Sequence, residues 1–143
     1  MRGEKDMNWV LRIIREFFYR EGFIEVNTPK IIVSATEGGA DLFSLDYFGK
    51  KAYLAQSPQL YKEQLMLYFE KVFEIAQYFR AEKFHTPRHL TEFTSVDIEV
   101  AFADYFEVMK IAEELVKFTL REVSKRCRRE LEILKHTLPK CPS

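Results

Sequence analysis

The sequence is poor in the features that mark secreted, membrane-spanning or metal-binding chains. Cys127 and Cys141 are the only cysteines in 143 residues, and their spacing matches no metal site, which favours a reducing compartment. No apolar run approaches the ~18 residues of a membrane span, and the opening residues MRGEKDMNW lack the apolar core of a secretory signal. Acidic and basic residues balance at 22 each, so no overall charge attracts nucleic acid or membrane. We therefore expect a soluble cytoplasmic domain with no membrane partner.

The chain does contain enough apolar side chain for one folded core. Hydrophobic residues make up 47% of the sequence, and 13 of them are phenylalanine. A chain of this length fits one domain, so we predict a single domain over residues 1–143. No internal repeat and no low-complexity segment interrupts it.

Hydrophobic spacing predicts a mixture of helices and strands. Apolar residues three and four apart indicate a helix over residues 7–21, and Ser57 resembles the N-cap of a second helix over residues 58–69. Asp104 and Glu107 have the spacing of a capping box at the start of a third, long helix. Extended segments are predicted at residues 23–27, 30–34, 42–48, 52–55, 72–82 and 92–102. The pattern predicts an α+β fold in which helices flank an antiparallel β-sheet.

The segment FRAEKFHTPRHLTEF, residues 79–93, joins two of the predicted strands and is rich in charge. Alternation places Arg80 and Glu82 on one side of the first strand, and Asp97 and Glu99 on one side of the second. If the strands pair, all four charges project from the same face of the sheet. Arginine suits a carboxylate or phosphate there, because its planar guanidinium donates two parallel hydrogen bonds. The simpler alternative is that these charges pair with one another on a solvated face.

The loop between the strands supplies further polar groups. Arg88 and His89 are suited to a polyphosphate, and Phe93 offers a flat ring on which a nucleobase could stack. His85 and His89 are four apart, which also fits a metal site on a helix. Pro87 lies between them and argues against a helix there, so we expect no metal site.

Four segments resemble the catalytic domain of the class II aminoacyl-tRNA synthetases. FRAE, a loop and RHLTEF are similar to motif 2 (residues 79–99), and GFIEVNTPKII is similar to motif 1 (residues 22–32). Between them, ATEGGADLF and QSPQLYKE resemble the aspartate-binding segments of archaeal and eukaryotic-type aspartyl-tRNA synthetases. The resemblance covers about residues 9–123 in the expected order. It implies a partial class II synthetase catalytic core.

The resemblance implies that the motif 2 residues bind ATP. Arg80 would bridge the α-phosphate of ATP and the carboxylate of the amino acid, which makes it the catalytic residue. Glu82 would lie at the adenine end, and Phe93 would stack on the adenine ring. Arg88 and His89 would approach the terminal phosphates. A carboxylate is already a nucleophile, so the reaction needs positioning and charge neutralisation but no general base.

The resemblance also implies a site for aspartate. Lys62 would supply a cation for the side-chain carboxylate of the substrate, and Gln59 would face the substrate beside it. Ser57 and Asp97 would hold the α-ammonium group, and Glu37 would close over the bound amino acid. Because a lysine complements a carboxylate better than an amide, aspartate is favoured and asparagine is the alternative.

Motif 3, a GxGxGxER-like stretch, is missing from the sequence, as are the acidic residues that would hold the Mg²⁺ expected for the family. The resemblance therefore implies an aspartate–tRNA ligase-like fragment that binds ATP and aspartate for aspartyl-adenylate formation, with impaired turnover. Its partners would be tRNA(Asp), as in the full-length family, and a second copy in a homodimer formed through motif 1. Two alternatives remain. One is a non-catalytic synthetase paralogue that serves as a dimerising or binding module. The other is a protein like asparaginyl-tRNA synthetase or asparagine synthetase.

Overall fold

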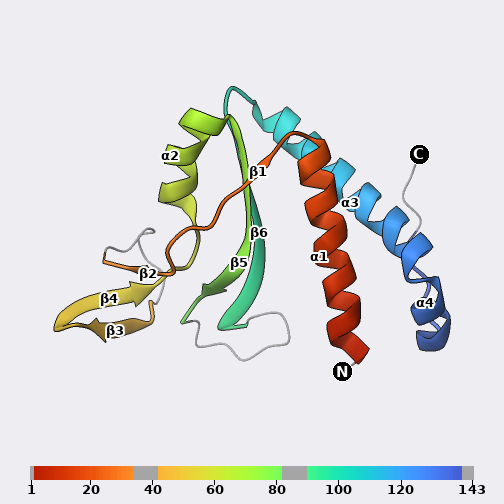
Figure 1. Ribbon diagram of the computed structural model, residues 1–143, viewed down its shortest axis with the longest axis horizontal. Helices are drawn as coiled ribbons and strands as arrows, with labels where there is room; N and C mark the ends of the chain where they lie inside the picture. Colours follow the sequence, from red (N-terminus) through yellow and green to blue (C-terminus); the bar gives the residue numbers. More distant parts are fainter. Residues whose placement is uncertain (1, 34–41, 82–89, 140–143) are drawn as a thin grey trace. The chain divides into compact units, whose positions relative to one another are not determined.

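The computed structural model describes residues 2–33, 42–81 and 90–139. The chain divides into two compact units, each of which is described by itself. A helical unit comprises Met1–Phe23 and Phe102–Ser143, and a sheet unit comprises Ile24–Ala101 (Figure 1). The α+β class predicted from the sequence is confirmed. Within the described ranges, no helix has the length and apolarity that crossing a membrane requires.

The helical unit contains α1 (Arg2–Arg20), α3 (Tyr105–Arg126) and α4 (Arg128–Leu134). α1 and α3 are joined by an aromatic contact and an ion pair. The Phe17 and Phe118 ring centroids lie 5.6 Å apart. Arg126 donates two hydrogen bonds to the carboxylate of Glu16, at 2.8 and 2.7 Å. These hydrogen bonds hold the pKa of Glu16 below its usual value.

α3 begins with the capping box that the sequence predicts. The side chain of Asp104 accepts a hydrogen bond from the Glu107 backbone N–H at 2.9 Å. The Glu107 side chain in turn accepts one from the Asp104 backbone N–H, also at 2.9 Å. Two backbone donors that would otherwise lack a helical partner are therefore satisfied at the first turn. α4 was not predicted, because its charged sequence shows no clear apolar stripe.

The sheet unit contains two three-stranded sheets and one helix, α2 (Gln59–Phe69). The first sheet has the order β1-β5-β6, in which β5 pairs antiparallel with β6 and parallel with β1. The second sheet is antiparallel and has the order β2-β4-β3. The strands are β1 (Ile24–Glu25), β2 (Ile31–Ile32), β3 (Ser44–Tyr47), β4 (Lys50–Leu54), β5 (Lys71–Phe79) and β6 (Glu92–Val100).

The hairpin between β3 and β4 is tighter than the sequence predicts. Phe48 and Gly49 form its turn with φ angles of 54° and 77°, whereas the predicted turn spanned residues 49–51. Two consecutive positive φ angles are typical of the two-residue turns whose twist matches that of paired strands. Gly49 adopts this conformation readily, and Phe48 adopts it at some cost.

The register of β5 and β6 decides which side chains share a face. Glu74 lies opposite Asp97, and Tyr78 lies opposite Phe93. The Arg80 backbone N–H continues the ladder by donating to the Thr91 carbonyl at 2.9 Å. Directly opposed residues project from the same side of a sheet. The prediction that Arg80 shares a face with Asp97 and Glu99 is therefore confirmed.

The apolar face of this hairpin is buried in β5 but less so in β6. Phe73 and Ile75 are buried, whereas Thr94 and Val96 on the same face are exposed, Val96 by 37%. On the opposite, more polar face, Glu74 and Tyr78 are fully buried. α2 contacts both strands, and Tyr78 joins a buried cluster with Ile32 of the second sheet. Charged groups can be buried on this polar face because Glu74 and Lys62 both have hydrogen-bonding or ionic partners on it.

Replacing Asp104 with alanine should destabilise the protein by about 1 kcal/mol, because it removes the acceptor at the N-terminus of α3. The free energy of unfolding from urea titrations at neutral pH measures the effect. Asp104→Asn is the matched control, since it keeps a capping oxygen and should stay close to the parent. Equal stability of the alanine variant and the parent would contradict a stabilising role for this cap.

Candidate active site

The site centres on the buried ammonium group of Lys62. The Lys62 side chain lies in α2 and is only 2% exposed. Its Nζ atom lies 3.4 Å from Asp97 Oδ1 and 3.2 Å from Glu99 Oε1. It also donates to the backbone carbonyl of Ile98 at 3.3 Å. A buried ammonium is tolerated only with such partners, so Lys62 holds α2 against β6.

The charges of this cluster are unequal. Asp97 and Glu99 supply two carboxylates to a single ammonium group, which leaves one excess negative charge. Their side chains are 25% and 21% exposed, so a small molecule can reach them. A partly exposed cluster of this charge favours a bound cation such as the α-ammonium group of an amino acid. Lys62 at the same point favours an anion, so the cluster can bind a zwitterion.

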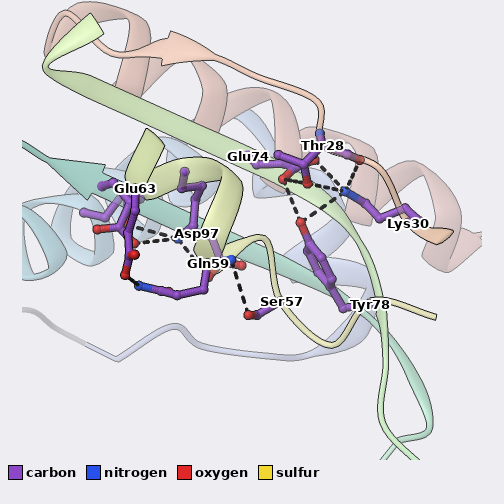
Figure 2. A network of polar contacts seen from close by, with 11 residues as sticks. Thr28, Lys30, Ser57, Gln59, Glu63, Glu74, Tyr78 and Asp97 are labelled. Carbon is purple, nitrogen blue, oxygen red and sulfur yellow. Dashed lines mark hydrogen bonds and ion pairs between the residues drawn. The ribbon is translucent and has the colours of Figure 1, made fainter. Parts of the chain in front are cut away.

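Gln59 and Ser57 contact each other at the first turn of α2. Figure 2 shows Gln59 turned toward Glu63, to which its Nε2 atom donates at 2.9 Å. Ser57 Oγ accepts from the Gln59 backbone N–H at 3.4 Å. The N-cap position of α2 is Pro58 and not Ser57, which corrects the predicted start of the helix. Ser57 still satisfies a backbone donor of the first turn.

Arg80 and Phe93 form a second part of the site on the same sheet face. The guanidinium carbon of Arg80 lies 5.3 Å from the centroid of the Phe93 ring, within the range of a cation–π contact. Arg80 is exposed, and Phe93 is half-buried against the cluster formed by Ile32, Ala55 and Tyr78. The ring therefore supports the guanidinium group of an exposed arginine.

The two parts lie at different points along the strands. Arg80 lies opposite Thr91, six residues before Asp97, which corresponds to about 20 Å along β6. Between Phe93 and Asp97, this face carries the cross-strand pair of Ala76 and Ser95, which are both small. An elongated ligand could lie on this face, with an anionic group near Arg80 and a zwitterionic group near Lys62.

Glu74, a fully buried carboxylate of β5, lies on the same face as Asp97. Its two oxygens accept hydrogen bonds from the Thr28 backbone N–H and the Thr28 hydroxyl, both at 2.8 Å. The Tyr78 hydroxyl donates to it at 2.7 Å, and Lys30 Nζ at 2.7 Å. Figure 2 shows these residues gathered around Glu74, apart from the residues near Asp97. The network ties the segment after β1 to the middle of β5.

The network also shifts two ionisation equilibria. Burial alone would raise the pKa of Glu74, but the hydrogen bonds from Lys30, Thr28 and Tyr78 outweigh it and hold the pKa below its usual value. Burial raises the pKa of Tyr78, and its hydrogen bond to Glu74 raises it further. At neutral pH, Glu74 is therefore an anion and Tyr78 is a neutral donor.

Most residues of the Glu74 network were not predicted from the sequence. Glu74, Thr28, Lys30 and Tyr78 were not proposed as site residues, and Glu99 was seen only as part of a charged face. The position of Glu74 between Phe73 and Ile75 in a strand could have indicated the network, because a carboxylate among apolar residues needs a partner.

Four predicted site residues, Glu37, Glu82, Arg88 and His89, lie outside the described residues, so their roles stay predictions. Within the ranges that the structure describes, no three His, Cys, Asp or Glu side chains form a group that could hold a metal ion. The residues near Lys62 therefore do not fit an all-protein Mg²⁺ site.

Comparison with known families gives a match over nearly the whole chain. The family model of tRNA synthetases class II (D, K and N) matches residues 6–142. Curated relatives agree with it. The chain is 54% identical over 129 residues to an aspartate–tRNA(Asp/Asn) ligase of Saccharolobus solfataricus, a match that covers 90% of this chain and 30% of the relative. It is 64% identical over 105 residues to an aspartate–tRNA(Asp) ligase of Picrophilus torridus, covering 73% of this chain and 25% of the relative.

A solved structure has the same fold. Asparaginyl-tRNA synthetase from Pyrococcus horikoshii, complexed with asparaginyl-adenylate, matches with a TM-score of 0.86 and 41% sequence identity. The match covers 91% of this chain and 30% of that protein. The chain thus spans under a third of the length of these relatives.

Replacing Glu74 with glutamine should cost about 3 kcal/mol of stability at neutral pH, because it leaves the Lys30 ammonium without its anionic partner. The pKa of Glu74 is lowered on folding, so its contribution is complete above pH 4.5, the ordinary value, and is lost as the pH falls through the folded value. The stability difference between parent and variant should therefore shrink in acid. Urea titrations from neutral to acidic pH measure it.

Glu92→Gln, at an exposed position of β6, is the matched control and should show a small difference. A Glu74→Gln difference that stays constant into acid would contradict the assigned charge on Glu74.

Proposed function

The chain belongs to the class II tRNA synthetases of the D, K and N group, and we propose that it binds ATP and aspartate for the formation of aspartyl-adenylate. The observation that carries this proposal is the Lys62–Asp97–Glu99 cluster, which shares one sheet face with Arg80 and Phe93. One end of that face suits a zwitterion and the other suits a phosphate beside an aromatic ring.

The nucleotide end of the site would act mainly through charge and position. An oxygen of the substrate α-carboxylate attacks the α-phosphorus of ATP, the bond to the bridging oxygen breaks, and pyrophosphate leaves. Arg80 can donate to both the α-phosphate and the attacking carboxylate, and so offset the charge that develops between them. Phe93 can stack the adenine, with Glu82, Arg88 and His89 as further ATP-binding residues. Mg²⁺ accompanies ATP in this family, and no step is assigned to it.

At the amino-acid end, Asp97 and Ser57 would hold the α-ammonium group of aspartate. Lys62 would contact the side-chain carboxylate, Gln59 would line the same site, and Glu37 would close over it. Glu99 is added to this set, because it shares the Lys62 ammonium with Asp97. The excess negative charge of the cluster supports binding of an ammonium group there.

Asparagine is the second candidate substrate, because the contacts that Lys62 makes with Asp97 and Glu99 do not exclude it. Lys62 was assigned to aspartate because an amide would leave its charge unpaired. In the structure Asp97 and Glu99 already neutralise that charge, so this reason does not hold. The relatives named for aspartate support aspartate as the first choice.

The remaining partners follow from the same proposal. tRNA(Asp) would accept the activated amino acid, and the motif 1 segment would support a homodimer. The sequence holds no GxGxGxER-like stretch, so we expect this chain by itself to turn over slowly. The alternative function is that of a dimerising module without catalytic activity.

Aspartate-dependent exchange of radiolabelled pyrophosphate into ATP tests the proposal directly. We expect a slow signal that needs aspartate and falls about 100-fold or more in Arg80→Ala, since one donor to the developing charge is lost. The stability of the variant should be unchanged, because Arg80 is exposed. Exchange that is absent, together with no binding of ATP or aspartate by calorimetry in folded protein, would overturn the proposal.

The substrate choice is tested by comparing aspartate and asparagine in the same assay. We expect aspartate to be preferred over asparagine. Because Asp97 and Glu99 already neutralise the Lys62 ammonium group, we expect Lys62→Gln to weaken the use of both amino acids without reversing the preference. Glu63→Gln, on the exposed side of α2, is the control and should keep the preference. A preference of the parent protein for asparagine would show that asparagine, and not aspartate, is the substrate.

A further inference from the structure

A second charged feature lies in the helical unit. α3, α4 and the segment up to Pro139 line an open hollow of about 1080 Å³. Among its described lining residues, Glu132 supplies a single carboxylate. Five cationic side chains line it: Lys117, Arg121, Lys125, Arg128 and Lys135.

The hollow is basic although the chain as a whole is neutral. Residues 117–139 hold seven lysines and arginines against three glutamates, a surplus of four positive charges in a chain with net charge zero. Lys117, Arg121 and Lys125 are four apart on α3, so they form one row along the helix. A concentrated surplus of this kind creates a local positive potential that the net charge does not reveal.

The ion pairs at the hollow do not prevent it from binding an anion. Lys125 pairs with Glu122 at 3.2 Å, and Arg128 pairs with Glu132 at 3.1 Å; the Lys125 and Arg128 side chains are 64% and 82% exposed. Lys117, which is 28% exposed, pairs with Glu113 at 2.7 Å and keeps that partner. Exposed pairs of this type contribute little to stability, and salt screens them. A phosphate can therefore take the place of either glutamate at small cost.

Besides its cationic residues and Glu132, the lining contains leucine, serine, threonine, proline and His136, but no Phe, Tyr or Trp among the described residues. Single-stranded nucleic acid is usually bound through several bases stacked on successive aromatic rings, and this hollow offers the single imidazole ring of His136. Contacts between a duplex and a row of lysines and arginines go to the phosphates and need no such ring. The chemistry of the hollow fits the outside of a double helix.

We propose that the hollow lined by α3 and α4 binds the phosphodiester backbone of double-helical RNA without regard to sequence. The choice of RNA rests on the proposed function, because an enzyme that activates an amino acid for tRNA must meet RNA stems. The cationic row then orients a stem on the helical unit, and Lys125, Arg128 and Lys135 are exposed cationic side chains of the hollow.

Fluorescence anisotropy of the full chain with a labelled RNA hairpin tests this surface. The probe has a stem of about 16 base pairs, and an oligo-U strand of equal length serves for comparison. From about 50 to about 200 mM salt, five phosphate contacts give a slope of log K against log salt of about −4. In the Lys125→Gln/Arg128→Gln/Lys135→Gln variant the slope should fall to about −2, with binding at least about 10-fold weaker.

The control variant, Arg12→Gln/Lys50→Gln/Lys51→Gln, removes the same number of positive charges elsewhere on the surface and should bind like the parent. Circular dichroism shows whether each variant is folded. Equal weakening by both variants, tighter binding of oligo-U than of the hairpin, or no binding at about 50 mM salt would each overturn the proposal. None of these outcomes bears on pyrophosphate exchange, which needs no RNA, so the two proposals can fail separately.

Discussion

The ammonium group of Lys62 is the charge on which the candidate site depends. It is almost fully buried, and two carboxylates and one backbone carbonyl of β6 surround it. An isolated charge in that position would be too costly, so the packing of α2 against β6 depends on the carboxylates of Asp97 and Glu99. The same contact that holds the helix therefore also fixes the two carboxylates in a reachable place. Stability and ligand binding are coupled through one side chain.

Glu74 connects the Lys62 cluster to a second set of buried contacts in the sheet. It lies directly opposite Asp97 in the β5–β6 ladder, so the supporting network and the candidate site occupy neighbouring strands of one face. Four hydrogen bonds satisfy its carboxylate and leave it rigid. Tyr78, held by Glu74, is the cross-strand neighbour of Phe93, whose ring supports Arg80. A continuous set of contacts thus runs from the segment after β1 to the guanidinium group.

Sequence patterns predicted local features well and burial poorly. The 104–107 capping box and the shared face of Arg80 and Asp97 follow from spacing alone, because both depend on neighbours along the chain or on strand alternation. Alternation cannot say which face is covered, so Glu74 and Tyr78 were placed on a face whose burial was not foreseen. Likewise, the position of Lys62 in a helix does not reveal its partners 35 residues away. Site roles came from the family resemblance, which the family match supports at the level of the family.

The central claim is that one face of the β1-β5-β6 sheet holds an aspartyl-adenylate between Lys62 and Arg80. The most direct measurement is a crystal structure of this chain with a non-hydrolysable aspartyl-adenylate analogue. We expect the adenine on the Phe93 ring, the phosphate mimic at Arg80, and the α-ammonium group of the analogue at Asp97. An analogue bound elsewhere, or a Lys62 cluster that stays closed and empty at saturating analogue, would contradict it.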